Sequence, residues 1–391
     1  MKKYNFDAII NREGTNALKL DVLKQRYGRS DLIPMWVADM DFASPPCVKK
    51  AITARAEHGI FGYTCASEEY YQSIIKWVGR HHGWNIEQEW ISFVPGIVKG
   101  IAFVIDCFTT EGDKVIIQPP VYHPFRIIPK LHHREVVYNE LIFDGENYRM
   151  DFESLKQQAK TAKVLILCNP HNPGGRVWTK EELVQLAEIC YDNKVLVISD
   201  EIHSDLALNG HKHVPFASVS EKAAENSITF MAPSKTFNIA GIVSSFSVVS
   251  NADLRDKFYN YLKASELEEG HIFAYLAAQA VYQDGDEWLL ELKDYLWENI
   301  CFTDQYLKKN FPQVKAVIPQ ASFLVWLDCR ELGMSQKDLV SFFVNEAKLA
   351  LNDGAVFGPG GNGFMRLNVG TPRSIVEKSL QQLVEAYIQH Q

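Results

Sequence analysis

Residues 163–200 have the sequence KVLILCNPHNPGGRVWTKEELVQLAEICYDNKVLVISD, and this stretch decides the fold. The apolar run at 164–168 predicts a buried strand, and the capping box Thr179-Lys-Glu-Glu182 predicts the start of a helix. The apolar face of that helix would carry Leu183, Leu186, Ala187 and Cys190. The run at 195–199 predicts the next strand. Strand, helix and strand in this order form the unit of a mainly parallel sheet covered by helices, so we predict an α/β fold.

Two further apolar runs end close to polar or aromatic residues. Residues 227–231 end just before Ala232-Pro-Ser-Lys235, and residues 114–118 end just before Pro119-Pro-Val-Tyr122. In open parallel α/β sheets, ligands bind outside the carboxyl ends of the strands, because loops and helix N-termini converge there. We therefore predict that one crevice collects the side chains of Tyr122, Asn172, Asp200 and Lys235.

The chain of 391 residues is longer than one hydrophobic core normally supports, which predicts two domains. From about Glu287 the sequence indicates a smaller α/β unit, with a glycine-rich turn at 357–363 followed by the strand-like run 364–369. We predict a large domain over residues 46–286 and a small domain made of residues 1–45 and 287–391.

The composition is that of an ordinary globular protein, with 47% apolar and 23% charged residues. The net charge of −8 comes without a basic stripe, which argues against nucleic acid or an anionic membrane as a partner and favours a small molecule. The sequence has neither a signal-peptide core at its start nor an apolar stretch of membrane-spanning length, so we expect a cytoplasmic protein. Seven scattered cysteines without a C-x-x-C motif predict reduced thiols in the core.

Motifs for other ligands are missing from the sequence. It has no G-x-G-x-x-G after a strand and no P-loop, which disfavours nucleotide binding. His81-His82 and His132-His133 are adjacent pairs that do not share one face of a helix or strand and match no H-E-x-x-H pattern. We therefore expect surface histidines and no metal site.

Lys235 and Asp200 are the strongest candidates for chemistry. Lys235 lies in the polar run Ser-Lys-Thr-Phe-Asn directly after a predicted buried strand, although an isolated lysine of this kind is usually a surface charge. Asp200 follows the strand at 195–199, where a buried carboxylate needs a cation or strong hydrogen bonds. It is either a helix N-cap or the partner of a protonated pyridine nitrogen.

Four other candidates each have two interpretations. Asn172 is a loop residue or an amide that donates to a phenolate oxygen and to a substrate carboxylate. The helix start at Gly96, Ile97 and Val98 is an ordinary one or an anion site. Tyr122 belongs to the core or stacks on a flat ring. Arg366 forms an ordinary ion pair or binds a substrate carboxylate through two hydrogen bonds.

Taken in order, four motifs resemble those of the fold-type I, aspartate-aminotransferase-like enzymes that depend on pyridoxal phosphate. They are Asn172-Pro-Gly-Gly175, Ser199-Asp200-Glu-Ile-His203, Ser234-Lys235-Thr-Phe-Asn-Ile-Ala-Gly241 and Phe364-Met-Arg366-Leu-Asn. Within that superfamily the chain is similar, over nearly its whole length, to the MalY/PatB cystathionine β-lyase group. The motifs that indicate this group are Trp36-Val-Ala-Asp-Met-Asp-Phe42, Phe61-Gly-Tyr63, Pro119-Pro-Val-Tyr-His-Pro-Phe125 and Asp200-Glu-Ile-His-Ser-Asp205.

The resemblance implies a role for each candidate residue. Lys235 would bind the cofactor as a Schiff base, and Asp200 would pair with the pyridine nitrogen. Tyr122 would stack on the ring, Asn172 would contact its oxygen, and Arg366 would bind the substrate α-carboxylate. The phosphate would lie on the backbone of Gly96, Ile97 and Val98 near Ser234, with Tyr63 reaching in from the other subunit of a homodimer.

The resemblance also implies an activity: α,β-elimination of cystathionine or cysteine conjugates to thiol, pyruvate and ammonia, with Lys235 removing the Cα proton. Two positions depart from the aminotransferase pattern. His203 stands where a tyrosine usually contacts the ring oxygen, and Val243 stands where many members have a phosphate-binding arginine. Both favour the lyase group. An aminotransferase, and a regulatory protein that keeps this fold and acts through a partner, remain as alternatives.

Overall fold

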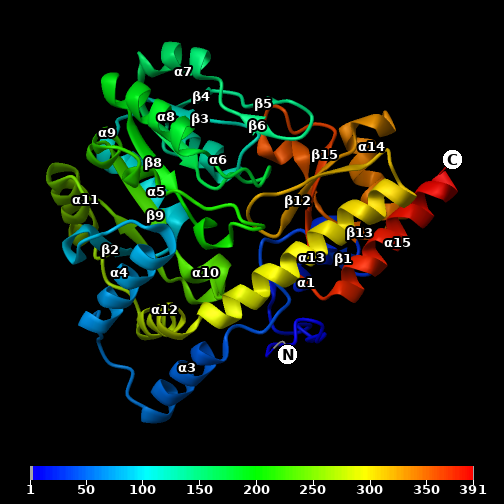
Figure 1. Cartoon of the computed structure of the whole chain (residues 1–391), viewed down its shortest axis with the longest axis horizontal. Helices are drawn as coiled ribbons and strands as arrows, with labels where there is room; N and C mark the ends of the chain where they lie inside the picture. Colours follow the sequence, from blue (N-terminus) through cyan, green and yellow to red (C-terminus); the bar gives the residue numbers. More distant parts are fainter. Residues whose placement is uncertain (1–2, 391) are drawn as a thin grey trace.

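The computed structural model describes residues 3–390, which form a larger and a smaller layered part (Figure 1). The larger part is built on a seven-stranded sheet. In sheet order its strands are β2 (Ile91–Val94), β10 (Ser245–Val248), β9 (Ser227–Met231), β8 (Leu196–Asp200), β7 (Ala162–Cys168), β3 (Lys114–Ile117) and β4 (Glu135–Tyr138). The five strands from β9 to β4 are parallel, whereas β10 is antiparallel to both of its neighbours.

Helices cover both faces of this sheet. They are α5 (Ile97–Phe108), α6 (Pro124–Leu131), α7 (Phe152–Ala159), α8 (Lys180–Asp192) and α11 (Ala252–Ala264). Leu165 of β7 packs in the core cluster that contains Leu183 of α8, whereas its neighbour Ile166 packs in the cluster that contains Ile101 of α5. Successive strand residues point to opposite faces, so a strand buried on both faces needs a continuous apolar run instead of an alternating one.

The smaller part is a four-stranded antiparallel sheet packed against long helices. Its strands, in sheet order, are β11 (Lys315–Val317), β12 (Leu324–Asp328), β15 (Phe364–Asn368) and β14 (Asn352–Asp353). Two helices bury their apolar faces with this sheet in one cluster, α13 (Asp286–Asn310) and α15 (Arg373–His390). Near the N-terminus, β1 (Ile33–Pro34) pairs in parallel with β13 (Leu349–Ala350), which joins the N-terminal region to the C-terminal part of the chain.

The remaining elements flank these two sheets. Helix α13 has 25 residues and extends from below the larger part to the smaller one, where it contacts α15 (Figure 1). The other helices are α1 (Leu18–Asp21), α2 (Leu23–Tyr27), α3 (Pro46–His58), α4 (Glu68–His82), α9 (Glu221–Glu225), α10 (Pro233–Thr236), α12 (Ile272–Asp284) and α14 (Gln336–Ser341). A short hairpin consists of β5 (Ile142–Phe143) and β6 (Tyr148–Arg149).

The strands and the helix predicted from residues 163–200 are confirmed, and Thr179 and Glu182 cap α8 reciprocally as the capping box predicts. Two positions differ from the prediction. Asp200 is the last residue of β8 instead of the first residue after it. Lys235 lies in the helical turn α10 instead of a loop, because Pro233 at its first position fixes a helical φ and needs no N–H partner.

Two expectations about residue location are wrong in part. His82 is buried, not on the surface, because its ring meets the buried carboxylate of Asp205 at 2.9 Å. All seven cysteines are free as expected, yet only Cys168, Cys190 and Cys329 are buried, and Cys65 is exposed.

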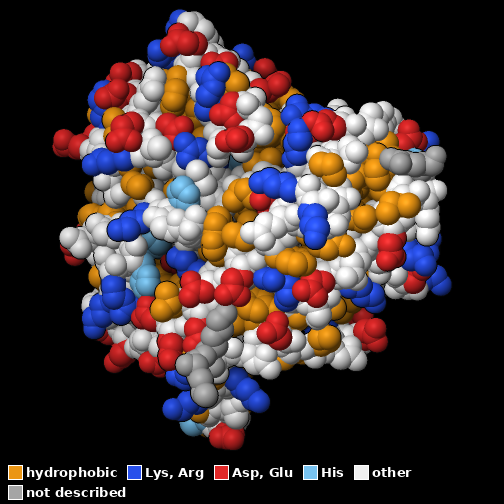
Figure 2. Space-filling view, turned by 45° about the vertical axis from the view of Figure 1, so that its right-hand side comes forward, with side chains coloured by type: hydrophobic (Ala, Val, Ile, Leu, Met, Phe, Trp, Pro, Cys, Tyr) orange, Lys and Arg blue, Asp and Glu red, His pale blue; other side chains and the backbone are white. Residues whose placement is uncertain are grey.

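On the face drawn in Figure 2, cationic and acidic side chains are interspersed, and neither sign dominates a large area. Within residues 3–390, no helix combines the length and apolar composition that a membrane span requires.

Candidate active site

A cavity of about 350 Å³ lies where the central parallel strands end. The loops after β3 and β7 meet there, since the Tyr122 backbone N–H donates to the Asn172 carbonyl at 3.1 Å. Nine residues that the sequence singled out line this cavity: Gly96, Ile97, Val98, Tyr122, Asn172, Asp200, His203, Ser234 and Lys235. The side chains of Tyr122, Asn172, Asp200 and Lys235 thus lie around one cavity, as the positions of the strand ends predict.

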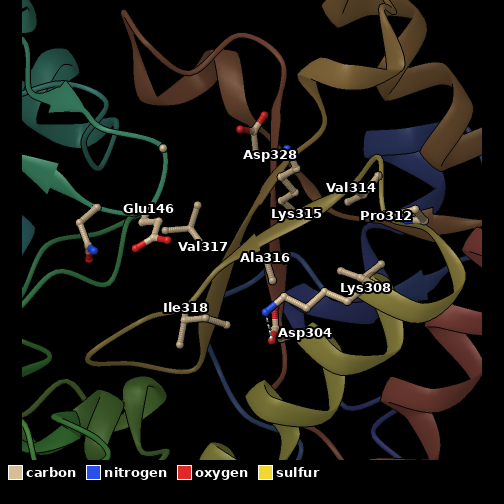
Figure 3. A pocket seen from close by; sticks show the side chains of 13 residues that line it. Glu146, Asp304, Lys308, Pro312, Val314, Lys315, Ala316, Val317, Ile318 and Asp328 are labelled. Atoms are coloured by element: carbon tan, nitrogen blue, oxygen red, sulfur yellow. Dashed lines mark hydrogen bonds and ion pairs between the residues drawn. The ribbon is translucent and has the colours of Figure 1, made fainter.

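A larger cavity of about 580 Å³ lies elsewhere, between the β5–β6 hairpin and the region of α13 and β11 (Figure 3). Its two lysines are already paired. Lys308 donates to Asp304 at 2.8 Å within α13, and Lys315 pairs with Glu331. No group of side chains suited to a metal ion occurs within residues 3–390. The smaller cavity is the better candidate for a functional site, because titratable residues with strongly shifted pKa values line it.

Lys235 is a buried amine with one hydrogen-bond acceptor. Its Nζ donates to the carbonyl oxygen of Ala38 at 2.6 Å. Burial lowers the pKa of Lys235 to about 8, and the positive charge of Arg366 acts in the same direction, while Asp39 and Asp200 oppose the shift. An amine with a pKa near neutrality can exist unprotonated at physiological pH, which both a nucleophile and a general base require.

Asp200 is a buried carboxylate at the end of β8. Its Oδ1 accepts a hydrogen bond from the backbone N–H of Ile202 at 3.1 Å, and no ion pair forms with it within residues 3–390. Burial raises the pKa of Asp200 to about 7. A carboxylate held out of water without a cation is costly, so the cavity is suited to a ligand that brings a positive charge to this position.

Arg366 is a buried guanidinium next to the cavity. Its Nη1 donates to Oδ1 of Asn172 at 2.9 Å, and its Nη2 donates to the carbonyl of Trp36 at 3.2 Å. Its buried Nε has no hydrogen-bond partner, and no acidic side chain pairs with Arg366 in the described part of the chain. Burial lowers the pKa of Arg366 to about 10. The interpretation as an ordinary ion pair therefore fails, and the guanidinium charge beside Asn172 is left available for a ligand anion.

The start of α5 forms one end of the cavity. Gly96 has a φ of 112°, which only glycine adopts without strain. No atom lies within 4 Å of the position that a Cβ on this residue would occupy, so the space beside its backbone is open. The first N–H groups of a helix are available for an anion at such a place. Ser234 and Val243 also line the cavity, and so does Lys99, a cation that the sequence does not single out. These groups suit a phosphate without an arginine at position 243.

Tyr122 and His203 provide the ring-shaped walls of the cavity. Burial raises the pKa of Tyr122, so its hydroxyl stays protonated. Burial lowers the pKa of His203 to about 3, which keeps the imidazole neutral, and its buried Nδ1 has no partner. A neutral imidazole donates from one nitrogen and accepts at the other, so His203 is able to contact a polar atom of a ligand.

The positions of Tyr63 and Ala38 differ from what the sequence predicts about this cavity. Tyr63 is fully exposed and does not reach this cavity in the single chain. Ala38 was not singled out, although its carbonyl accepts the hydrogen bond from Lys235. The signal was present, because the motif at 36–42 belongs to those that indicate the enzyme group, but a backbone carbonyl leaves no trace in residue type.

The cavity therefore offers an amine for covalent attachment, a buried carboxylate lacking a cation, an aromatic wall and an anion site. These features match the aldehyde, pyridine nitrogen, ring and phosphate of pyridoxal phosphate, respectively, and the residues present fit that group. A protein with this fold and this set of side chains is of the class that carries out amino-acid chemistry on pyridoxal phosphate.

The chain belongs to the aminotransferase class I and II family, whose model matches residues 30–383. It is 41% identical to the cystathionine β-lyase PatB of Bacillus subtilis (strain 168), over 98% of this chain and 99% of that protein. It is 32% identical to the protein MalY of Escherichia coli (strain K12), over 98% of both chains. The group predicted from the motifs is thereby confirmed.

A solved structure supports the same assignment of the fold. Cystalysin from Treponema denticola, whose crystal structure contains pyridoxal 5'-phosphate, superposes on this chain with a TM-score of 0.96 at 34% identity. The superposition covers 99% of this chain and 100% of cystalysin. The predicted fold-type I architecture is confirmed.

Proposed function

We propose that this chain is a pyridoxal-phosphate-dependent carbon–sulfur β-lyase that splits cystathionine and related cysteine thioethers into a thiol, pyruvate and ammonia. The observation that carries the proposal is that Lys235 and Asp200 line one cavity, in which Asn172 is bonded to the neighbouring Arg366. The similarity to PatB, which is named a cystathionine β-lyase, supports the choice of reaction.

Each residue of the cavity has a part in holding the cofactor. Lys235 would bind it covalently, Asp200 would pair with the ring nitrogen, and Tyr122 would pack on the ring. Asn172, whose oxygen is engaged by Arg366, has its amide nitrogen left and would donate it to the ring oxygen. Gly96, Ile97, Val98 and Ser234 would hold the phosphate, and His203 would lie near the ring oxygen. When bound, the cofactor supplies the electron sink for the pair left on the substrate Cα.

The chain's own residues bind the substrate and move the proton. Arg366 holds the α-carboxylate through its free Nε–H and so fixes the Cα–H bond toward Lys235. Lys235, which would hold the cofactor before the substrate binds, provides the amine that removes the Cα proton. The Cβ–S bond then breaks with its electron pair leaving on sulfur, which takes up a proton. With one water, the three-carbon fragment gives pyruvate and ammonia.

The direct test is incubation of the cofactor-loaded protein with cystathionine and with S-substituted cysteines, followed by pyruvate and free-thiol measurement. We expect one pyruvate per thiol without any added amino acceptor. A 2-oxo acid that keeps the thioether, formed only after an amino acceptor is added and without release of thiol, would instead establish an aminotransferase. That alternative uses the same cavity residues, because both reactions begin with removal of the Cα proton. They differ afterwards, since the lyase breaks the Cβ–S bond whereas the aminotransferase leaves that bond intact.

We also propose that the active protein is a homodimer in which Tyr63 enters the cavity of the partner subunit. Tyr63 has an exposed fraction of 110%, and the neighbouring Ile60 and Phe61 are exposed as well. Adjacent exposed apolar side chains of this kind mark protein contact sites. Sedimentation should give twice the monomer mass. A Tyr63→Ala protein mixed with a Lys235→Ala protein should then recover activity, because the mixed dimer has one intact site.

The cellular compartment and the domain boundaries are two further parts of this proposal. The seven free thiols are consistent with a reducing compartment, so we place the protein in the cytoplasm. Residues 46–286 are proposed as the large domain, with residues 1–45 and 287–391 as the small domain. Limited proteolysis, with cleavage expected near residues 45 and 286, tests these boundaries.

A further inference from the structure

The segment 36–42 forms part of the wall around Lys235. The Ala38 carbonyl accepts the hydrogen bond from the Lys235 amine, and the Trp36 carbonyl accepts one from Arg366. The two residues assigned to the proton transfer and to the substrate carboxylate therefore both donate to the backbone of one short segment. The position of that segment decides where the Lys235 amine points.

Two asparagines that lie far apart in the sequence, Asn238 and Asn368, fix the backbone of this segment. Asn238, three residues after Lys235, donates to the carbonyls of Met40 (2.9 Å) and Phe42 (2.8 Å) and accepts from the Met40 N–H (3.0 Å). Asn368, two residues after Arg366, donates to the carbonyls of Val37 (2.6 Å) and Asp39 (2.7 Å). The segment is thus tied to the surroundings of both functional residues.

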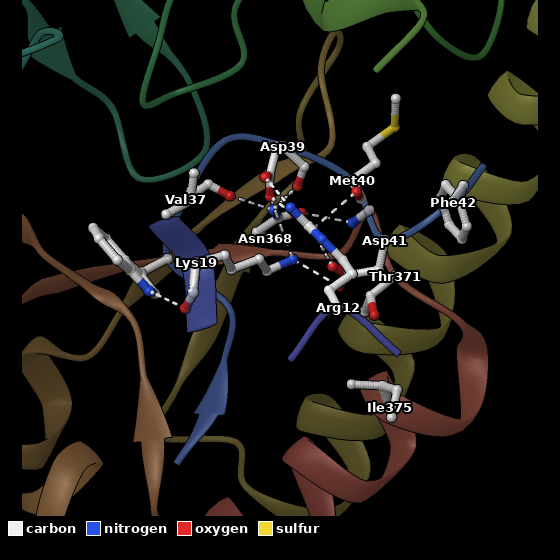
Figure 4. Close-up of polar contacts among 12 residues, drawn as sticks. Arg12, Lys19, Val37, Asp39, Met40, Asp41, Phe42, Asn368, Thr371 and Ile375 are labelled. Atoms are coloured by element: carbon white, nitrogen blue, oxygen red, sulfur yellow. Dashed lines mark hydrogen bonds and ion pairs between the residues drawn. The ribbon is translucent and has the colours of Figure 1, made fainter. Parts of the chain in front are cut away.

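The side chains of the same segment enter an ion cluster, which we define as Arg12, Lys19, Asp39 and Asp41 (Figure 4). Arg12 bridges the two carboxylates, with Nη2 at 2.6 Å from Asp39 and Nη1 at 2.7 Å from Asp41. Lys19 donates to Asp41 at 2.7 Å. The Trp36 indole N–H donates to the Lys19 carbonyl at 3.0 Å, which ties the helix α1 to the start of the segment.

The ion cluster is too buried to be an incidental surface feature. The Lys19 side chain is 1% exposed, and the other three are about one-fifth exposed. The two cations balance the two carboxylates. A buried cation is costly unless it is paired, and apolar side chains in its place stabilise a fold as well or better. Unlike an apolar contact, a hydrogen-bonded ion pair holds its two partners at a defined distance and orientation.

We propose that the ion cluster positions the proton-transfer apparatus: by fixing residues 38–41, it holds the Ala38 carbonyl as the acceptor that aims the Lys235 amine at the substrate. Arg12, Lys19, Asp39 and Asp41 are therefore positioning residues of the lyase. The inference rests on the proposed function, because it concerns the base of that reaction. A misplacement of about 1 Å at a reacting group reduces rates by roughly 10²-fold, so such a clamp has a measurable purpose.

Asp39 and Asp41 differ in one respect. The charge of Asp39 acts on Lys235 and opposes the effect of burial, which lowers the pKa of that amine to about 8, and Asp41 is not among the main charges that act on this amine. Asp39 thus contributes through both position and charge. Asp41 contributes through position alone, and this contrast separates the two effects by experiment.

The test uses Asp39→Asn and Asp41→Asn, which keep the side-chain size, with Arg29→Gln as the matched control. Arg29 forms an exposed ion pair with Asp31 at 2.6 Å in the same N-terminal region and touches none of the cavity residues. In the cofactor-loaded protein we expect kcat for pyruvate release to fall at least tenfold in both asparagine variants, with KM changed less than threefold. The control should stay within twofold, and Asp41→Glu should recover part of the loss.

A second measurement needs neither cofactor nor substrate. Cofactor-free protein is acetylated with acetic anhydride over a pH series, and modification of Lys235 is followed by peptide mass spectrometry. Asp39→Asn should move the midpoint to lower pH, whereas Asp41→Asn should leave it in place. If either variant is poorly folded, Arg12→Lys and Arg12→Met replace it, and lysine should retain more kcat than methionine.

Wild-type kcat in Asp41→Asn, or wild-type kcat together with an unchanged midpoint in Asp39→Asn, would overturn the inference. Equal kcat in Arg12→Lys and Arg12→Met would do the same. A wild-type protein that releases no pyruvate from any thioether refutes the proposed function separately, and the shift of the Lys235 midpoint then still tests the link from Asp39 to Lys235.

Discussion

Replacement of Arg366 by lysine is expected to raise KM for thioether substrates and to leave a smaller effect on kcat. In the structure, Nη1 and Nη2 are engaged by Asn172 and Trp36, and the buried Nε–H is free. A substrate carboxylate would take that N–H and a remaining Nη hydrogen. Lysine keeps the charge but not the planar two-donor geometry, so one charge-assisted hydrogen bond is lost. Such a bond contributes about 1.5–3 kcal/mol, which is roughly 10- to 150-fold in kcat/KM.

The assay compares a cysteine thioether with the corresponding decarboxylated amine, a cysteamine thioether. Loss of a contact made to the carboxylate alone should reduce kcat/KM of Arg366→Lys for the cysteine compound by the stated factor, with no comparable loss for the amine. Thermal unfolding and the absorbance of the bound cofactor serve as controls for the fold. Equal losses for both compounds, or none for the cysteine compound, would contradict the assignment of Arg366.

Three further predictions concern the cofactor site and the interior behind it. Lys235→Ala should lose the visible absorbance of the lysine-bound cofactor and nearly all turnover, and full activity by pyruvate assay would refute its role. Asp200→Asn should reduce kcat by at least 10²-fold while the cofactor still binds, because a neutral amide cannot stabilise the protonated ring nitrogen; stopped-assay kcat beside absorbance titration checks this. Burial opposes ionisation of Asp205, but hydrogen bonds from His82, Trp77 and Thr236 prevail and lower its pKa to about 2, so ionised Asp205 stabilises the fold above its ordinary pKa of 3.8. The stability advantage of wild type over Asp205→Asn in urea unfolding should therefore shrink by about 2 kcal/mol as pH falls from 4 toward 2, and a difference that grows on acidification would contradict this.

Much of the larger sheet could be predicted because its strands and helices carry strong local signals. The apolar run of β7 has the length of a buried strand and is followed by turn residues, and the spacing of the capping box at Thr179 marks the start of a helix. The cavity residues follow from the same logic, since parallel strands end at one edge of the sheet. Lys235 was assigned to a loop because a four-residue helix is too short to show a period.

The interior contacts of histidine and the N-terminal region could not be predicted in this way. His82 is the last residue of α4 and belongs by sequence to a polar pair, yet its ring lies against Asp205, which is 123 residues away. Arg12 and Lys19 are ordinary charged residues in a polar stretch, and nothing in their spacing indicates two carboxylates at positions 39 and 41. Residue type indicates that a charge needs a partner but not which one it meets.

The sequence by itself indicated the α/β fold through periodicity, the enzyme group through the order of its motifs, and Lys235, Asp200 and Arg366 as candidate site residues, because these signals lie in short stretches of the chain. Tertiary structure alone decided that Lys235 donates to Ala38, that Arg366 engages Asn172, and that an ion cluster holds the segment between them. These contacts join residues up to nearly 200 positions apart. Their formation depends on how whole elements pack, and the free energy of that packing is a sum over many residues that no single motif contains.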